Sequence, residues 1–215
     1  MAEFQRARSD DAKRMREAAI LDAARAIATQ RSIRTVTLTD IADAVGMHKS
    51  ALLRYFETRE QIFLRLTAEG WVEWSAALRA DLDAMAHASA ATVAGAFART
   101  LAARGVFCDL LAQTPLNLER NVSIESVREF KIGAHEQVDA ISASVRRLLP
   151  RLSERDGVDL VAAAVSHAGY LWQIGTPGEE LAALYRSDPR LAHAIVEIEP
   201  RLERLLSALL TGMLA

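Results

Sequence analysis

Residues 37–63 read TLTDIADAVGMHKSALLRYFETREQIF, and this stretch decides the fold. Thr37 is placed to cap a helix over residues 38–45, because its hydroxyl can accept a hydrogen bond from the exposed amides of the first turn. Asp40 follows three residues later and completes a variant of the capping box. Gly46 can adopt the left-handed conformation that ends such a helix. The pattern therefore predicts a short, firmly bounded helix.

A second short helix follows closely on the first. After a turn at residues 47–49, the sequence predicts a helix over residues 50–56, and Thr58 then caps a long helix that begins at Arg59 and extends to about residue 85. Two short helices joined by a glycine-containing turn form a helix-turn-helix unit. In that unit the second helix enters the major groove of DNA, while the first crosses the phosphate backbone.

The rest of the chain predicts further helices and no strands. Alanine, leucine, arginine and glutamate favour helices, and no stretch alternates apolar and polar residues long enough to form a strand. A loose arm is expected over residues 1–10, a helix over 11–30 and a loop over 117–122. The other expected helices span residues 89–104, 106–113, 123–149, 153–174, 179–186, 188–199 and 200–213. The fold class is therefore all-α.

Charge and cysteine content limit the location and partners of the protein. Residues 1–65 carry 12 Lys and Arg against 9 Asp and Glu, a net +3, whereas the remaining 150 residues carry 14 against 19, a net −5. A basic first third suits a protein that brings one end to a polyanion, and ordinary surface variation is the alternative, so the charge alone does not decide the partner. Cys108 is the single cysteine, which fits a reducing cytoplasm. The sequence lacks a signal peptide and a membrane-spanning run, so we expect a cytoplasmic protein without a membrane partner.

The N-terminal segment strongly resembles the DNA-binding domain of the tetracycline-repressor (TetR) family, over about residues 10–65. The resemblance rests on the residues of the helix-turn-helix and on the apolar face of the first helix. The matching residues are Ile20, Ala24, Ile27, Thr37-Leu38-Thr39-Asp40-Ile41-Ala42, Val45-Gly46-Met47, Leu52, Tyr55-Phe56 and Arg59-Glu60. One position departs from the pattern, because Leu53 stands where many members carry an aromatic residue that contacts phosphate.

The resemblance implies a set of DNA contacts. Phosphate contacts are implied for Thr37, Thr39, Lys49, Tyr55 and Arg59. Base readout in the major groove is implied for His48, Ser50, Ala51 and Arg54, with Ala51 limited to a methyl contact. The alternatives are a turn position for His48, solvated surface positions for Lys49 and Arg54, and a purely structural role for Tyr55 and Phe56.

The resemblance also implies a DNA-binding domain over residues 1–58 and a ligand-binding and dimerisation domain over residues 59–215. Aromatic and sulfur-containing side chains of the second domain are the pocket candidates, with ordinary core packing as their alternative: Trp74, Met85, Phe97, Phe107 and Phe130. Two helices with small or leucine-rich faces are the dimer candidates, with a monomer as the alternative: Ala162, Ser166, Gly169, Leu202, Leu205 and Leu209.

The expected function is a homodimeric transcriptional regulator, a repressor that binds a palindromic DNA operator and is released by an unknown small-molecule effector. The alternative is a helical protein-interaction module without DNA binding. The sequence contains no HExxH pattern, Gly-rich phosphate loop or GxSxG motif, and its five histidines are scattered. We therefore expect neither an enzyme nor a metal or other cofactor.

Overall fold

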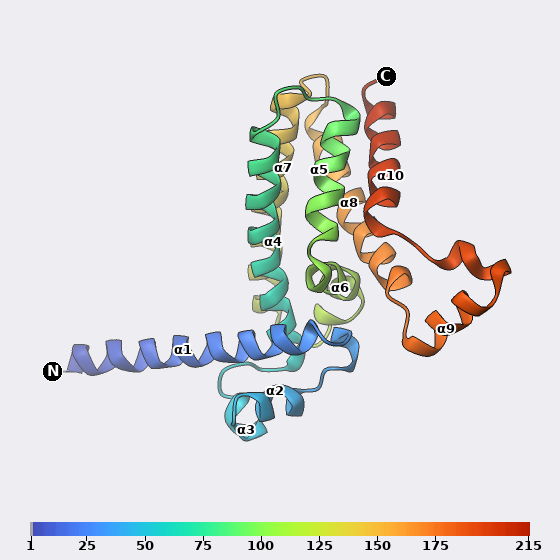
Figure 1. Ribbon diagram of the computed structural model, residues 1–215. Helices are drawn as coiled ribbons and strands as arrows, with labels where there is room; N and C mark the ends of the chain where they lie inside the picture. The colour runs from blue at the N-terminus through green and yellow to red at the C-terminus, as the bar shows by residue number, and fades with distance from the viewer. Residues whose placement is uncertain (1) are drawn as a thin grey trace.

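The computed structural model describes residues 2–215, and the side chains of residues 11–191 and 193–215. Every regular element in this part of the chain is helical, which confirms the all-α fold class (Figure 1). In chain order the elements are α1 (Ala2–Ala28), the 3₁₀ turn η1 (Ile33–Thr35), α2 (Leu38–Ala44), α3 (Lys49–Leu52), α4 (Arg59–Asp83), α5 (Ala90–Ala102), α6 (Gly105–Gln113), the π-helical turn η2 (Thr114–Leu118), α7 (Ile124–Leu148), α8 (Glu154–Gly175), α9 (Glu179–Ser187), the 3₁₀ segment η3 (Pro189–Ala194) and α10 (Ile198–Met213).

The N-terminal helices α1, α2 and α3 form a small unit at one end of the molecule (Figure 1). Ile20 and Ala24 of α1, Ile41 of α2 and Leu52 of α3 are fully buried, and Phe56 closes the same core. The apolar positions of the first helix are therefore the ones that hold the helix-turn-helix in place, as their spacing predicts.

The expected loose arm over residues 1–10 is wrong for residues 2–10, because α1 already begins at Ala2. Residues 2–28 contain neither proline nor glycine and are rich in alanine, arginine and glutamate, so helix propensity favours continuing the helix outward. The N-terminal half of α1 projects well beyond the rest of the molecule (Figure 1). Residue 1 lies outside the described part of the chain.

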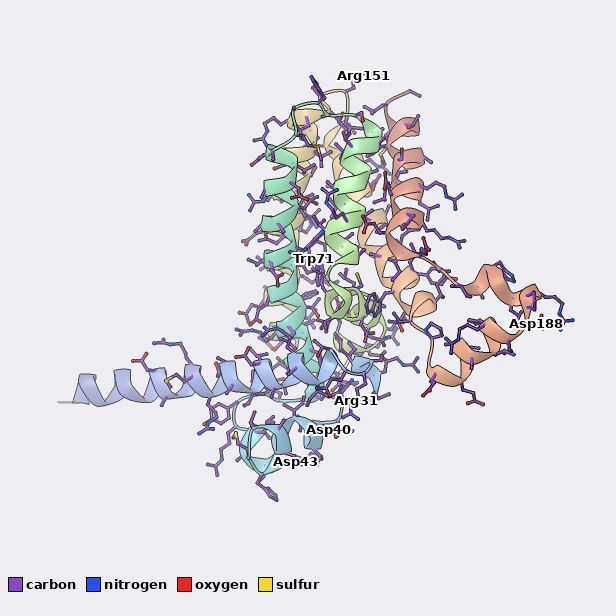
Figure 2. The ribbon with its side chains drawn as sticks, in the orientation of Figure 1. Arg31, Asp40, Asp43, Trp71, Arg151 and Asp188 are labelled. Carbon is purple, nitrogen blue, oxygen red and sulfur yellow. The ribbon has the colours of Figure 1, made fainter. Side chains whose placement is uncertain are left out.

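The larger C-terminal part is a bundle of long helices. α4 packs against α7, α7 against α8, and α10 against both α5 and α8. Trp71, labelled in Figure 2, lies within the bundle and is 7% exposed. α9 and η3 form an arm that projects sideways, with Asp188 near its tip (Figure 2). The long helix α4 runs from the N-terminal unit along one side of the bundle (Figure 1).

Most helix ends follow the predicted capping signals. Ser123 caps α7, and Ser153 with Asp156 forms a reciprocal capping box at the start of α8. Pro200 lies at the third position of α10 rather than the first, which is still within the first turn, where a missing N–H costs little. The expected loop over residues 117–122 begins with the end of the π-helical turn η2.

Among residues 2–215 we find no helix that combines the length and the apolar character needed to cross a membrane.

Candidate DNA-binding surface and groove

The start of α2 is fixed by the predicted capping box. The Asp40 amide donates to the Thr37 hydroxyl at 3.2 Å, and the Thr37 amide donates back to the Asp40 carboxylate at 2.7 Å. Arg31 pairs with the same carboxylate at 2.7 Å. The hydrogen bonds from Thr37, together with Arg31, hold the pKa of Asp40 below its usual value. Asp40 therefore remains ionised at neutral pH and stabilises the helix start.

The turn between α2 and α3 depends on Gly46, which has a φ of 63°. Other residues rarely adopt this conformation, so glycine is required for the tight reversal. The Met47 amide then donates to the Ala42 carbonyl at 2.9 Å. His48 is the N-cap of α3, where Nδ1 lies 2.9 Å from the Ser50 hydroxyl. His48 therefore has a structural role in the turn and still exposes its ring.

α3 is shorter than predicted, because its regular α-helical part ends at Leu52 and residues 53–55 form a looser turn. The expected contact residues nevertheless lie on or beside α2 and α3. The exposed ones are Thr37, Thr39, His48, Lys49, Ser50 and Arg54, and the half-buried ones are Ala51 and Tyr55. This surface presents two cations, Lys49 and Arg54, and several hydrogen-bonding groups at the end of the molecule that α2 and α3 form.

Arg59 does not lie with these residues, because its side chain makes contacts within its own chain, and the phosphate contact expected of it stays a prediction. Its guanidinium donates to the carbonyls of Ile33 and Val36, pairs with Glu60 at 2.8 Å and lies 4.9 Å from the centre of the Phe63 ring. The side chain is only 18% exposed. Arg59 therefore holds the η1 connector against the start of α4.

The candidate dimer residues of α8 and α10 divide into two groups. Ala162, Ser166 and Leu205 are exposed, and Leu209 is half-buried. Leu202 is fully buried within its own chain. A Cβ on Gly169 would lie 3.0 Å from the Ala112 backbone nitrogen, so this glycine permits a close approach of α8 to α6 in the same chain. Gly169 and Leu202 therefore offer no surface to a partner.

Three of the five pocket candidates pack together in the core. Trp74 lies 6.0 Å from both Phe97 and Phe107, measured between ring centroids, and Trp71 adjoins the group. The Trp74 indole donates to the Thr100 hydroxyl at 3.0 Å. Met85 follows the end of α4, and Phe130 lies on α7. A ligand contact through Trp74, Phe97, Phe107 or Met85 stays a prediction.

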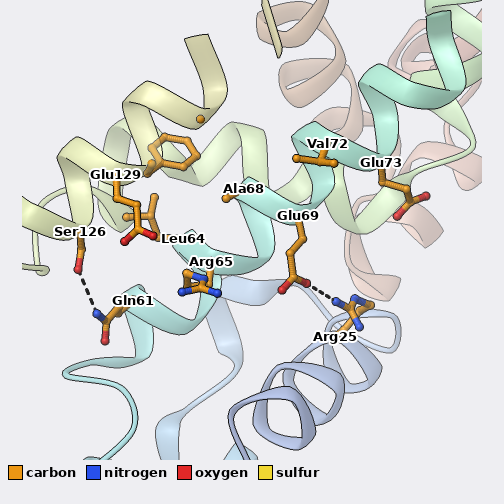
Figure 3. A pocket seen from close by; sticks show the side chains of 12 residues that line it. Arg25, Gln61, Leu64, Arg65, Ala68, Glu69, Val72, Glu73, Ser126 and Glu129 are labelled. Atoms are coloured by element: carbon orange, nitrogen blue, oxygen red, sulfur yellow. Dashed lines mark hydrogen bonds and ion pairs between the residues drawn. The ribbon is translucent and has the colours of Figure 1, made fainter. Parts of the chain in front are cut away.

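A groove of about 590 Å³ runs between α4 and α7 and is bordered by Arg25 of α1 (Figure 3). We call it the α4–α7 groove. Its apolar lining consists of Leu64, Ala68, Val72, Phe130 and Gly133, and its polar lining of Arg25, Gln61, Arg65, Glu69, Glu73, Ser126 and Glu129. Phe130 is thus the one predicted pocket residue that lines it.

Most charged groups around the groove are already paired. Arg25 bonds Glu69 at 2.6 Å, and Glu73 lies 3.2 Å from Arg104. Among the described side chains, Arg65 has no hydrogen-bond or ion-pair partner, and neither has Glu129. The sequence prediction omitted these residues. The polar residues at 61, 65, 69 and 73 recur every four positions, and this spacing marks one face of a helix.

Besides the bonds to α4, two polar contacts among the described residues join the N-terminal unit to the bundle. The buried Asp109 carboxylate accepts from the Ile33 amide at 2.9 Å and from the Gln173 side chain at 2.8 Å. Near the other end of the unit, Glu57 accepts from the amide and hydroxyl of Ser123 at 3.2 and 3.0 Å. The helix-turn-helix is therefore fixed to α6, α7 and α8 as well as to α4.

The molecule combines a helix-turn-helix that exposes cations and hydrogen-bonding groups with a helical domain, and a long helix joins the two. This combination places it in the class of helix-turn-helix DNA-binding proteins.

Comparison with family models identifies the family within this class. The model of bacterial regulatory proteins of the tetR family matches residues 20–66, and the tetracyclin repressor-like C-terminal domain matches residues 68–215. The chain belongs to the TetR family of DNA-binding transcriptional regulators, which is a non-enzymatic family. No curated protein matches the chain.

Solved structures agree on the fold. The fatty acid degradation regulator FadR from Bacillus halodurans is 13% identical, with a TM-score of 0.53 over 89% of this chain and 94% of its own. A TetR-family regulator from Mesorhizobium loti is 13% identical, with a TM-score of 0.52 over 94% and 96%. FadR from Bacillus subtilis in complex with stearoyl-CoA is 13% identical, with a TM-score of 0.53 over 88% and 97%. Identities this low show a shared fold alone.

Proposed function

We propose that the protein is a repressor that binds a palindromic operator as a homodimer and leaves it when a small molecule binds the C-terminal domain. We place the boundary between DNA-binding and effector domains at residues 58 and 59, where Thr58 caps α4 through a bond from the Gln61 amide. In this proposal α4 belongs to the effector domain and transmits its movement.

The exposed residues of α2 and α3 support the DNA contacts. Thr37 and Thr39 lie at the start of α2 and would contact phosphates, as would Lys49 and the half-buried Tyr55. The base-reading residues would be His48, Ser50, Ala51 and Arg54. Arg54 is the one with the fork of donors that suits guanine in the major groove.

The outer faces of α8 and α10 support a dimer. α10 buries Leu206 and Leu210 against its own chain and leaves Leu205 36% exposed on another side. Tyr170 of α8 is 63% exposed, on a helix that also exposes Ala162 and Ser166. Two copies joined by these faces would form an isologous interface. Such a dimer would have to hold its recognition helices about 34–36 Å apart to reach successive major grooves.

One relationship carries the proposal that a ligand controls DNA binding, namely the pair of bonds from Ser123 to Glu57. Glu57 ends the helix-turn-helix and Ser123 begins α7, so a shift of α7 relative to α4 would displace the DNA-binding unit. A ligand that favours the shifted conformer would lower operator affinity by the ratio of its affinities for the two conformers.

The test begins with selection of preferred duplexes from a random pool and fluorescence anisotropy on the best sequence. We expect a palindromic sequence, two chains per duplex, and affinity that falls steeply with salt, with a slope of about −0.9 per phosphate contact. Light scattering should give twice the 23.5 kDa of one chain. A monomer, or a protein that binds no duplex at low salt, would support the protein-interaction module instead.

Leu205→Glu provides a sharper test of the dimer. A charge on this exposed position should leave the helical content unchanged and produce monomers with weak operator binding. Ile132→Glu, at a site on α7 that is 56% exposed, is the matched control and should remain dimeric.

A further inference from the structure

The α4–α7 groove has the size and lining of a small-molecule site. Its volume of about 590 Å³ lies within the roughly 300–1,000 Å³ that is typical of ligand pockets. Leu64 and Phe130 form a buried apolar floor, and Val72 extends this apolar surface although it is 56% exposed. A hydrocarbon or aromatic body could cover this surface and remove it from water.

The charged residues of the groove indicate which polar group the ligand carries beside its apolar body. Arg25 is neutralised by Glu69 at 2.6 Å and by Asp22 at 2.6 Å, and Glu73 lies against Arg104. The other cation of the lining is Arg65, which forms no ion pair with any side chain in the described part of the chain. Figure 3 shows its guanidinium beside the groove on α4, one helical turn from Gln61 and one from Glu69. A guanidinium without a partner suits a carboxylate, which it can bind through two parallel hydrogen bonds.

Glu129 limits how much negative charge the ligand can carry. It reaches toward the groove from the opposite wall, on α7, and has no partner among the described side chains (Figure 3). With Glu69 and Glu73 it gives the lining three carboxylates against two guanidinium groups. A second anionic group on the ligand would therefore meet like charge, whereas a single carboxylate can reach Arg65.

We propose that the α4–α7 groove binds an amphipathic monocarboxylate, with its acid group on Arg65 and its apolar body along Leu64, Ala68 and Phe130. Binding itself is independent of the proposed repressor function, whereas the role of the groove as the effector site rests on it. The Gln61 side chain donates to Ser126 across the groove at 3.0 Å, so a ligand between α4 and α7 acts directly on the contact between these helices.

Calorimetric titration of the full chain with decanoate tests the site. Decanoate should bind saturably and with more than tenfold higher affinity than decanedioate or decylamine, and its affinity should fall between low and high salt because the contact is partly exposed. Arg65→Gln should weaken decanoate about tenfold and leave the weaker binding of decanol unchanged. Arg155→Gln, which removes an exposed arginine from α8, is the control.

A side chain that fills the groove tests whether decanoate binds there or at another place on the protein. Gly133 lines the groove, and a Cβ built there meets no atom within 4 Å, so Gly133→Leu should fit and block decanoate. Gly212→Leu on α10 is the matched control, because its Cβ also meets no atom within 4 Å. Circular dichroism checks that both variants fold.

The outcomes distinguish the site from the function. Absence of decanoate binding, equal binding by Gly133→Leu, or a preference for decylamine overturns the proposed site, whatever the DNA measurements give. Decanoate binding that Gly133→Leu abolishes supports it. If such binding leaves operator affinity unchanged, the site stands and its role as the effector site is rejected.

Discussion

The carboxylate of Asp109 on α6 accepts a hydrogen bond from the backbone amide of Ile33, 2.9 Å away in the connector that precedes the helix-turn-helix. Asp109 is 3% exposed, and its second oxygen accepts from Gln173 of α8. One buried side chain thus joins the DNA-binding unit to two helices of the C-terminal domain, and its loss should affect both stability and DNA binding.

Asp109→Ala leaves the buried Ile33 amide and the half-buried Gln173 side chain without acceptors. We expect a loss of about 1–3 kcal/mol in the free energy of unfolding, which lowers the melting temperature by roughly 2–4 °C per kcal/mol in a chain of this size. Thermal unfolding measures it. Asp139→Ala, at a site whose side chain is 69% exposed, is the control and should change little. Equal effects of the two variants would contradict the bridging role.

Lys49→Ala and Arg54→Ala should weaken DNA binding in different ways. Loss of the Lys49 phosphate contact in both chains of the dimer should lower affinity for all duplexes similarly and reduce the salt slope by about 1.8, which is about 0.9 for each chain. Loss of base readout at Arg54 should cost about 1–3 kcal/mol for each half-site and relax the preference at one position in each half of the operator. Anisotropy titrations on matched and mismatched duplexes measure both. If neither variant changes operator affinity, the proposed docking is wrong.

Arg59→Gln should act on stability and leave the salt slope of DNA binding unchanged. The guanidinium bonds the carbonyls of Ile33 and Val36, so its removal should cost about 2 kcal/mol of unfolding free energy. Urea titration measures this loss. A salt slope that falls as much as in Lys49→Ala would restore Arg59 to the phosphate contacts.

The capping box of α8 should make stability sensitive to acid. Hydrogen bonds from the hydroxyl and amide of Ser153 hold the pKa of Asp156 below its usual value of 3.8. Because the folded pKa lies below the unfolded one, this contribution is complete above about pH 4 and is lost as the pH falls through the folded pKa. Urea midpoints from pH 3 to 5 should therefore rise less steeply in Asp156→Asn than in the parent. Asp159→Asn on the same helix is the control.

Cys108 should not react while the protein is folded. Burial raises the pKa of its thiol to about 12, so almost no thiolate exists at pH 8. Labelling by iodoacetamide should be slow in buffer and fast in denaturing urea. Rapid labelling of the native protein would show that the α5–α6 region opens locally.

Local signals in the sequence were sufficient for the helix-turn-helix and for most helix ends. The capping box at Thr37 and Asp40, the left-handed Gly46 and the caps at Ser123 and Ser153 depend on residues within a few positions of one another. The exposed residues of α2 and α3 that we propose as DNA contacts come from the same short segment. The same propensities also extend α1 outward to Ala2, although residues 1–10 were expected to form an arm.

The tertiary structure alone decided what each face of these helices contacts. Arg59 turns toward the η1 connector, Gly169 meets α6 of its own chain, and the aromatic candidates Trp74 and Phe97 fill the core. The groove has Arg65 on one wall and Glu129 on the other, and these residues come from helices far apart in the chain. Periodicity defines the faces of a helix, whereas the neighbour of each face depends on how all the helices pack together, and that is a property of the whole chain.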